Sequence, residues 1–162
     1  MRFLLFLALI CAAPIAGRAD TATGPSGVAF VRVWPGWKGI NDFKRISEYF
    51  TDKENTGMYK VERSRNDSRD GYYFTVRVLS KNERMPGAKF VLKVITPDSP
   101  FPRTYTFPSV IQKGKSVYEL GLTGSDWPGR HAHPVAWKLQ LLAPDGTELV
   151  QQISFLWNPM DA

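Results

Sequence analysis

The amino-acid sequence predicts an all-β fold in which two antiparallel sheets pack face to face as a sandwich, with one short helix near residues 42–50. Two observations favour this fold class. About eight short segments place apolar side chains at every second position, which is the period of a strand with one buried face. Turn signals separate these segments, and no crossover helices join them, whereas a parallel sheet needs such crossovers and carries strands that are apolar on both faces.

The first 19 residues have the pattern of a cleavable signal peptide. Arg2 supplies a positive start, residues 3–15 are almost wholly apolar, and residues 16–19 (AGRA) place small side chains where a signal peptidase reads them. The apolar run of roughly 13 residues is shorter than the ~20 that a membrane-spanning helix needs. We therefore expect an exported protein, periplasmic or secreted, with no membrane span after cleavage.

Cleavage would also change the composition of the chain. It would remove Cys11, the only cysteine, so the remaining chain is predicted to have no disulfide and no zinc–thiolate site. Loss of Arg2 and Arg18 would lower the net charge from +6 to about +4. Such a mild charge, together with export, argues against a nucleic-acid partner. Residues 20–27 are small and polar and predict a flexible lead-in, and residues 28–158 are predicted to form a single domain.

A strand and a helix are predicted at the start of this domain. Residues 28–34 (VAFVRVW) are a β-branched and aromatic run, which is typical of a strand. Asn41-Asp42 can cap a following helix, in which apolar side chains recur at helical spacing. These side chains are Phe43, Ile46, Tyr49 and Phe50. We expect residues 42–50 to form an amphipathic helix that lies over one end or edge of the sheet.

Further strands follow, with turn signals between them. We predict strands over residues 58–63, 72–79, 89–96, 104–107, 115–122, 135–142 and 148–157. In the first of these, Tyr59 and Val61 are expected to face inward. Asp70-Gly71 favours a hairpin turn into the next strand. The three prolines within residues 97–103 bar ladder hydrogen bonds, so they mark either a crossing between sheets or a sheet edge.

The inward face of the remaining strands follows from the same alternation. The side chains predicted to face inward are Tyr72, Phe74, Val76 and Val78, then Tyr118, Leu120 and Leu122, then Trp137, Leu139 and Leu141, and finally Ile153, Phe155 and Trp157. Pro144-Asp145-Gly146 is a turn by its chemistry and joins the last two strands.

The predicted arrangement of strands, which closes with the hairpin VAWKLQLLAPDGTELVQQISFLW, resembles an immunoglobulin-like or fibronectin-type-III-like β-sandwich. The resemblance covers residues 58–157 and is one of architecture, because the paired cysteines of immunoglobulin domains are missing.

Tryptophans at turns are the most informative candidates for a binding site. The chain has five tryptophans, and Trp127 lies in a long loop, residues 123–134 (TGSDWPGRHAHP). Two interpretations compete. In one, the Trp127 ring folds back over the end of the sandwich as a hydrophobic plug. In the other, Trp127 forms a stacking and hydrogen-bonding face with Arg130, His131 and His133 for a sugar or protein partner.

The same loop raises two alternatives. His131 and His133 are the only histidines, and in extended backbone they project to one side, where they can chelate copper or zinc. The sequence names no third ligand. Ser125-Asp126 beside these histidines also allows a small hydrolase, although the chain has no G-x-S-x-G elbow and no glycine-rich phosphate loop.

We therefore expect a non-catalytic, exported module that binds a protein or a cell-envelope glycan through its loop end, with no cofactor. The alternatives are a metal-binding protein that uses His131 and His133, and a small secreted hydrolase.

Overall fold

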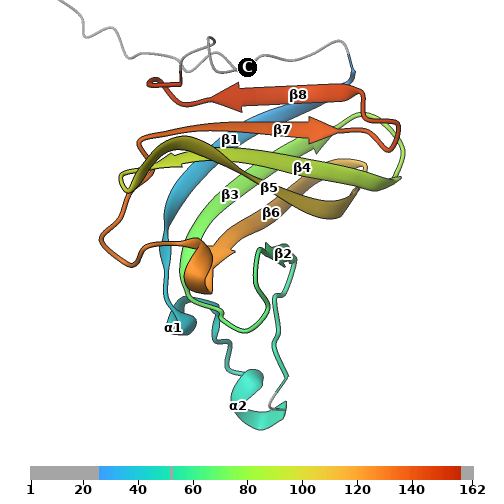
Figure 1. The fold of residues 1–162 in the computed structure, drawn as a ribbon. Helices are drawn as coiled ribbons and strands as arrows, with labels where there is room; N and C mark the ends of the chain where they lie inside the picture. The colour runs from blue at the N-terminus through green and yellow to red at the C-terminus, as the bar shows by residue number, and fades with distance from the viewer. Residues whose placement is uncertain (1–25, 52, 158–162) are drawn as a thin grey trace, which may run out of the picture.

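The computed structural model describes residues 26–51 and 53–157 and has two four-stranded sheets packed face to face. The first sheet has the order β1-β3-β6-β2, formed by Val28–Lys38, Gly71–Ser80, Gly114–Thr123 and Tyr59–Arg63. The second has the order β5-β4-β7-β8, formed by Ser99–Ile111, Met85–Thr96, Ala136–Leu142 and Glu148–Ile153. Figure 1 shows the sheets as two layers whose strands cross at an angle. All neighbouring strands are antiparallel except β2 and β6, so the two-sheet prediction is confirmed.

The core lies between the sheets and is built from alternate residues of the strands. The predicted inward faces of β3, β6 and β7 are all buried, and β4 adds Phe90, Leu92 and Val94. Aromatic rings link the layers, with Phe90 packed at 5.0 Å from Tyr118 and Phe74 at 5.6 Å from Trp137. Period-two placement of bulky side chains therefore accounts for the closure of the sandwich.

The outer face of the first sheet also carries buried side chains. Tyr73 is fully buried there, and Phe43 packs at 4.7 Å from its ring. Gly121 is opposite Tyr73 in the adjacent strand, and a Cβ at this position would lie only 2.4 Å from the tyrosine ring. The glycine therefore makes room for the ring, so that the segment after β1 can fold over this face.

A buried charge lies on the same outer face. Glu119 of β6 is 2% exposed, and its Oε2 accepts a hydrogen bond from Lys38 Nζ at 2.5 Å and another from Thr75 Oγ1 at 2.9 Å. A buried carboxylate is tolerated only when it is paired and hydrogen-bonded in this way. The pair connects the end of β1 to the middle of β6.

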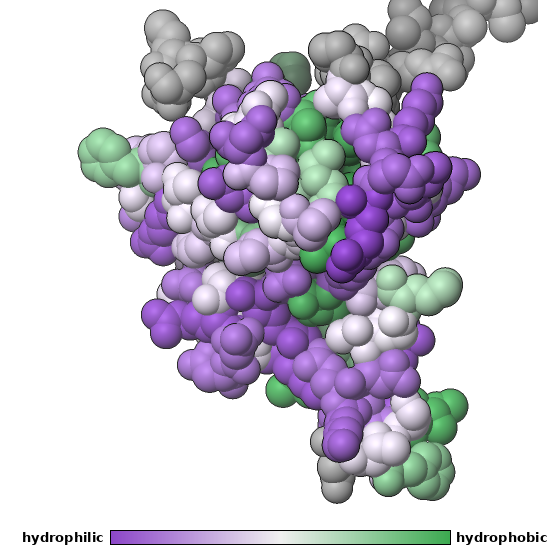
Figure 2. All heavy atoms as spheres, turned by 90° about the vertical axis from the view of Figure 1, so that its right-hand side faces the viewer, coloured by the Kyte–Doolittle hydropathy of each residue, from purple (hydrophilic) through white to green (hydrophobic). Residues whose placement is uncertain are grey.

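The single helix predicted over residues 42–50 is wrong. The structure has two short helices instead, α1 (Ile40–Phe43) and α2 (Glu48–Thr51). Phe43 packs on the sheet, whereas Ile46, Tyr49 and Phe50 are 80%, 72% and 84% exposed. Figure 2 shows hydrophobic side chains at the tip of the segment that protrudes below the sandwich. The helical spacing is present, but none of the described residues forms a surface that buries the apolar side chains of Ile46, Tyr49 and Phe50.

The placement of β2 also differs from the prediction. Asp70-Gly71 does not join a hairpin, because β2 pairs with β6 in parallel rather than with β3. Tyr59 lies on the outer face and is 45% exposed, and Val61 is half-buried on the same face, so the expected inward direction of both is wrong. A short strand at a sheet edge, such as β2, needs little apolar alternation. Its sequence therefore does not specify which side chains face inward or which strand it pairs with.

The bounds of β5 and β8 also differ from the predicted strands. β5 runs from Ser99 to Ile111 as the outer strand of the second sheet, so the proline-rich segment is the sheet edge that one of the two interpretations predicted. β8 ends at Ile153, and Phe155 is fully exposed while Trp157 is buried, so these side chains do not share one inward face as predicted.

The predicted signal peptide and most of the lead-in lie outside the described residues. Within residues 26–51 and 53–157, no helix has the length and apolarity needed to cross a membrane.

Candidate functional site

Trp127 lies in the core and not at the surface of its loop. The residue follows the 3₁₀ turn η1 (Gly124–Asp126), is 5% exposed, and stacks on Tyr72 with ring centroids 4.5 Å apart. Its Nε1 has no hydrogen-bond partner among the described residues. These observations agree with the plug interpretation, in which the indole closes the end of the sandwich.

The other three residues of the predicted loop site are at the surface. Arg130, His131 and His133 are all exposed. The His133 and Tyr72 rings form a T-shaped pair with centroids 6.1 Å apart. The loop therefore brings both His133 and Trp127 to the same tyrosine, while Arg130 lines a separate cavity.

That cavity has a volume of about 440 Å³ and lies at the loop end of the sandwich, where β1 ends and α1 begins. Its lining residues come from three segments that are distant in the sequence. They are Trp37, Gly39, Ile40, Asn41 and Asp42 after β1, Asp70 before β3, and Arg130 of the long loop. The cavity thus combines one aromatic wall with carboxylate, amide and guanidinium groups.

The aromatic wall is supported from the core. Trp37 stands opposite Tyr72 in the β1–β3 pairing and packs partly buried against the core. Because Tyr72 stacks on Trp127, the buried indole supports the tyrosine beside which Trp37 is placed. Burial also raises the pKa of Tyr72, so its hydroxyl stays neutral. Trp127 thus contributes to this end of the molecule as a support.

Local hydrogen bonds orient the two carboxylates of the cavity. The Asp42 Oδ2 atom accepts a hydrogen bond from the Gly39 backbone N–H at 2.7 Å, which closes the first turn of α1. The Asp70 Oδ1 atom accepts one from the Ser68 hydroxyl. Among the described residues, no ion pair involves Asp42, Asp70 or Arg130, and all three residues line the cavity.

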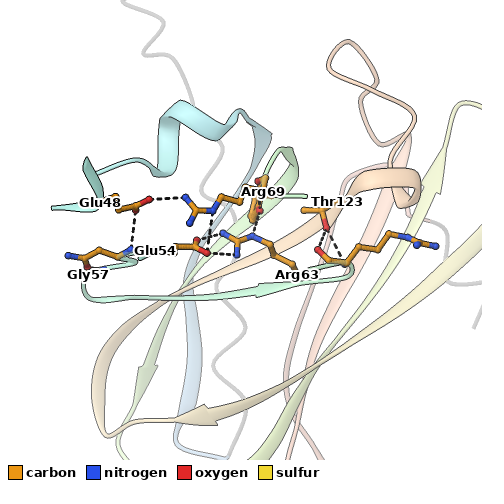
Figure 3. A network of polar contacts seen from close by, with 9 residues as sticks. Glu48, Glu54, Gly57, Arg63, Arg69 and Thr123 are labelled. Atoms are coloured by element: carbon orange, nitrogen blue, oxygen red, sulfur yellow. Dashed lines mark hydrogen bonds and ion pairs between the residues drawn. The ribbon is translucent and has the colours of Figure 1, made fainter. Parts of the chain in front are cut away.

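A polar network holds the segments that form the walls (Figure 3). Arg63 Nε donates to Tyr73 Oη at 2.9 Å, and Tyr73 Oη donates to the Arg69 carbonyl at 2.7 Å. Arg69 pairs with Glu48 of α2 at 2.8 Å, and both Arg63 and Arg69 pair with Glu54. The hydrogen bond from Arg69 lowers the pKa of Glu48, which keeps the pair charged over a wide pH range. The connection before β3 is thereby attached to the segment after α1.

Thr123 attaches the long loop to the same connection. Its Oγ1 accepts a hydrogen bond from the Arg65 backbone N–H at 3.1 Å and donates one to the Arg65 carbonyl at 2.7 Å. Arg65 Nε also lies 3.5 Å from Asp126 Oδ1. The loop that carries Arg130 and the connection that carries Asp70 are therefore held side by side.

Sequence reasoning identified Arg130 but missed the other walls of this cavity. The sequence pattern indicates Asp42 only as a helix cap and Asp70 only as a turn residue, and it does not single out Trp37. A signal was present, since all three are polar or aromatic residues at element ends. Only the tertiary arrangement shows that these element ends meet.

The geometry of the described residues offers little support for a metal-binding protein or a hydrolase. In the part of the chain that the structure describes, no group of three or more histidine, cysteine or acidic side chains is arranged to hold a metal ion. Within the same residues, neither imidazole forms a hydrogen bond to a serine or a carboxylate. A comparison of the sequence with protein-family models and with curated proteins finds no match.

Proposed function

We propose that this chain is an exported, non-catalytic module of immunoglobulin-like architecture that binds a cell-envelope glycan in the cavity at its loop end. The single observation that carries the proposal is the composition of the cavity: Trp37 forms one wall, and Asp42, Asp70 and Arg130 stand around it.

These groups match the chemistry of a sugar. The apolar face of a pyranose ring packs on an indole, while its hydroxyl groups need acceptors and donors at the same time. Carboxylates only accept hydrogen bonds and a guanidinium only donates them, so the cavity offers both kinds of partner. A volume of about 440 Å³ falls in the range of small-ligand pockets, about 300–1,000 Å³. A concave polar site of this size favours a glycan over a flat protein surface.

Strand order supports the architectural part of the proposal. In an immunoglobulin-type sandwich, strands A, B and E share one sheet and strands C, F and G share the other. Here β1, β3 and β6 occupy consecutive places in one sheet, and β4, β7 and β8 in the other, with β5 added beside β4. The strand β2 is an addition to this arrangement. It lies between β1 and β3 in the chain, but in the sheet it is an edge strand that pairs in parallel with β6.

The proposal is tested by co-sedimentation of the purified protein with peptidoglycan sacculi, chitin and cellulose. We expect at least one of these to retain the protein. Arg130→Ala and Asp70→Asn should each reduce retention at least tenfold, because they remove a donor and an acceptor from the cavity. Arg103→Ala is the matched control, since Arg103 is an exposed arginine on β5 of the other sheet.

Equal retention of the wild type and both variants would contradict the proposal. If no glycan retains the protein, while a protein partner is bound in a manner sensitive to Arg130→Ala, the loop end binds protein instead. Thermal unfolding of each variant checks that the fold is intact.

A further inference from the structure

A second cavity lies on the outer face of the first sheet, towards the end opposite α1. It has a volume of about 360 Å³ and is formed where β2 and β6 begin and β3 nears its end. Three basic side chains, Lys60, Arg77 and Lys115, line it together with the apolar side chains of Val31, Met58 and Tyr59. None of its lining residues is acidic.

Two of the three basic side chains of this cavity have no carboxylate partner. Among the described residues, neither Arg77 nor Lys115 forms an ion pair. Lys60 Nζ donates a hydrogen bond to the Val110 carbonyl at 2.7 Å. Burial, and next the charge of Arg84, lower the pKa of Lys60, while the neighbouring Glu62 carboxylate raises it.

Arg77 belongs to a pair of like charges that the sheet holds together. Arg32 stands directly opposite it in the β1–β3 pairing, and such a pair is destabilising on a sheet surface. The Trp34 ring partly offsets this repulsion, because the guanidinium carbons of Arg32 and Arg77 lie 4.6 and 5.1 Å from its centroid. The indole thus holds the guanidinium group of Arg77, which lines the cavity, next to that of Arg32.

The apolar part of the lining is exposed to solvent. Val31, Met58 and Tyr59 are 41%, 94% and 45% exposed. Large apolar side chains that are exposed as a group around a basic cavity provide a surface for the hydrocarbon part of a ligand.

From this combination we infer that the cavity binds an anionic amphiphile. Its negatively charged head group contacts Arg77 and Lys115, and its hydrocarbon chain lies along Val31, Met58 and Tyr59. The site is separate from the cavity at the loop end and does not depend on glycan binding.

Isothermal titration calorimetry with dodecyl phosphate below its critical micelle concentration tests this inference. Dodecyl maltoside carries the same chain without the charge, and inorganic phosphate carries the charge without the chain. We expect dodecyl phosphate to bind at least tenfold more tightly than either, because only it satisfies both halves of the cavity. Trp34 lies beside Arg77, so a change in tryptophan fluorescence should accompany binding.

Variants separate the two halves of the site. The double variant Arg77→Ala/Lys115→Ala should weaken the binding of dodecyl phosphate at least tenfold. The matched control, Arg103→Ala/Lys138→Ala, removes the same charge from the second sheet and should leave it unchanged. Met58→Gln should weaken binding several-fold without altering thermal unfolding, because Met58 is almost fully exposed.

The inference is overturned if dodecyl maltoside or inorganic phosphate binds as tightly as dodecyl phosphate, or if the double variant binds like its control. It is also overturned if phosphatidylglycerol vesicles bind the protein while monomeric dodecyl phosphate does not. In that case the basic face docks on a membrane surface and the cavity holds no single amphiphile.

Discussion

The buried indole of Trp127 allows a quantitative test of how the loop end of the sandwich is held. Substitution by alanine removes on the order of 150 Å² of buried apolar surface, which corresponds to about 4 kcal/mol at ~25 cal/mol per Å². Residual burial in the unfolded chain reduces this to about 3 kcal/mol. Loss of the stack on Tyr72, at 4.5 Å, adds about 1 kcal/mol.

One contribution has the opposite sign. The Nε1–H of Trp127 is buried without a hydrogen-bond partner among the described residues, and its removal recovers about 1 kcal/mol. We therefore expect Trp127→Ala to lower the free energy of unfolding by about 3 kcal/mol, within the range of about 3–5 kcal/mol measured for similar truncations. In a domain of this size the melting temperature should fall by about 10 °C.

Urea unfolding followed by circular dichroism measures this loss. Trp127→Phe is the companion variant: it keeps a ring against Tyr72 and removes the unpaired N–H, so it should cost about 1–2 kcal/mol. If Trp127→Ala lowers the free energy of unfolding by less than about 1 kcal/mol while abolishing ligand binding, the plug interpretation is refuted. Trp127 would then act as an exposed platform in solution.

Two further predictions concern charged groups. Glu119→Gln should destabilise the protein by about 2 kcal/mol, which is less than for a fully buried pair because Lys38 is partly exposed. In urea unfolding, the double variant Lys38→Met/Glu119→Leu should recover most of that loss. If the double variant recovers nothing, the Lys38–Glu119 pair does not account for the loss of stability. Burial raises the pKa of Glu62, so folding favours the protonated carboxyl group. Protonation of Glu62 therefore stabilises the folded protein at low pH, and this stabilisation is lost as the pH rises through the raised pKa. Glu62→Gln should therefore stabilise the protein at pH 7 but not below pH ~4; an equal effect at both pH values, measured by thermal unfolding, would contradict this assignment.

The core strands could be predicted from the sequence because their side chains face one uniform environment. Tyr72 to Val78, Tyr118 to Leu122 and Trp137 to Leu141 alternate clearly, and all of these inward positions are buried. The same reasoning failed where the environment is not uniform. The apolar side chains of Ile46, Tyr49 and Phe50 follow a helical period, but within residues 26–51 and 53–157 they stay exposed, and only the short helix α2 forms there.

The candidate site was predicted only in part. Arg130 was identified from the loop that carries it, and it does line the cavity at the loop end. Trp37, Asp42 and Asp70 could not be grouped with it, because each lies at least 60 positions before Arg130 in the sequence. The β1–β3 pairing brings the end of β1 to the residues next to Asp70. The sequence allows two roles for Trp127, and in the structure its ring is buried and stacks on Tyr72.

The sequence by itself determined the fold class, since strand periodicity is a local property that each segment carries in its own side chains. Only the tertiary structure decided the parallel pairing of β2, the burial of Glu119 and Trp127, and the residues that surround each cavity. These features depend on contacts between distant segments, and such contacts arise from the packing of the whole chain rather than from the pattern of any one segment.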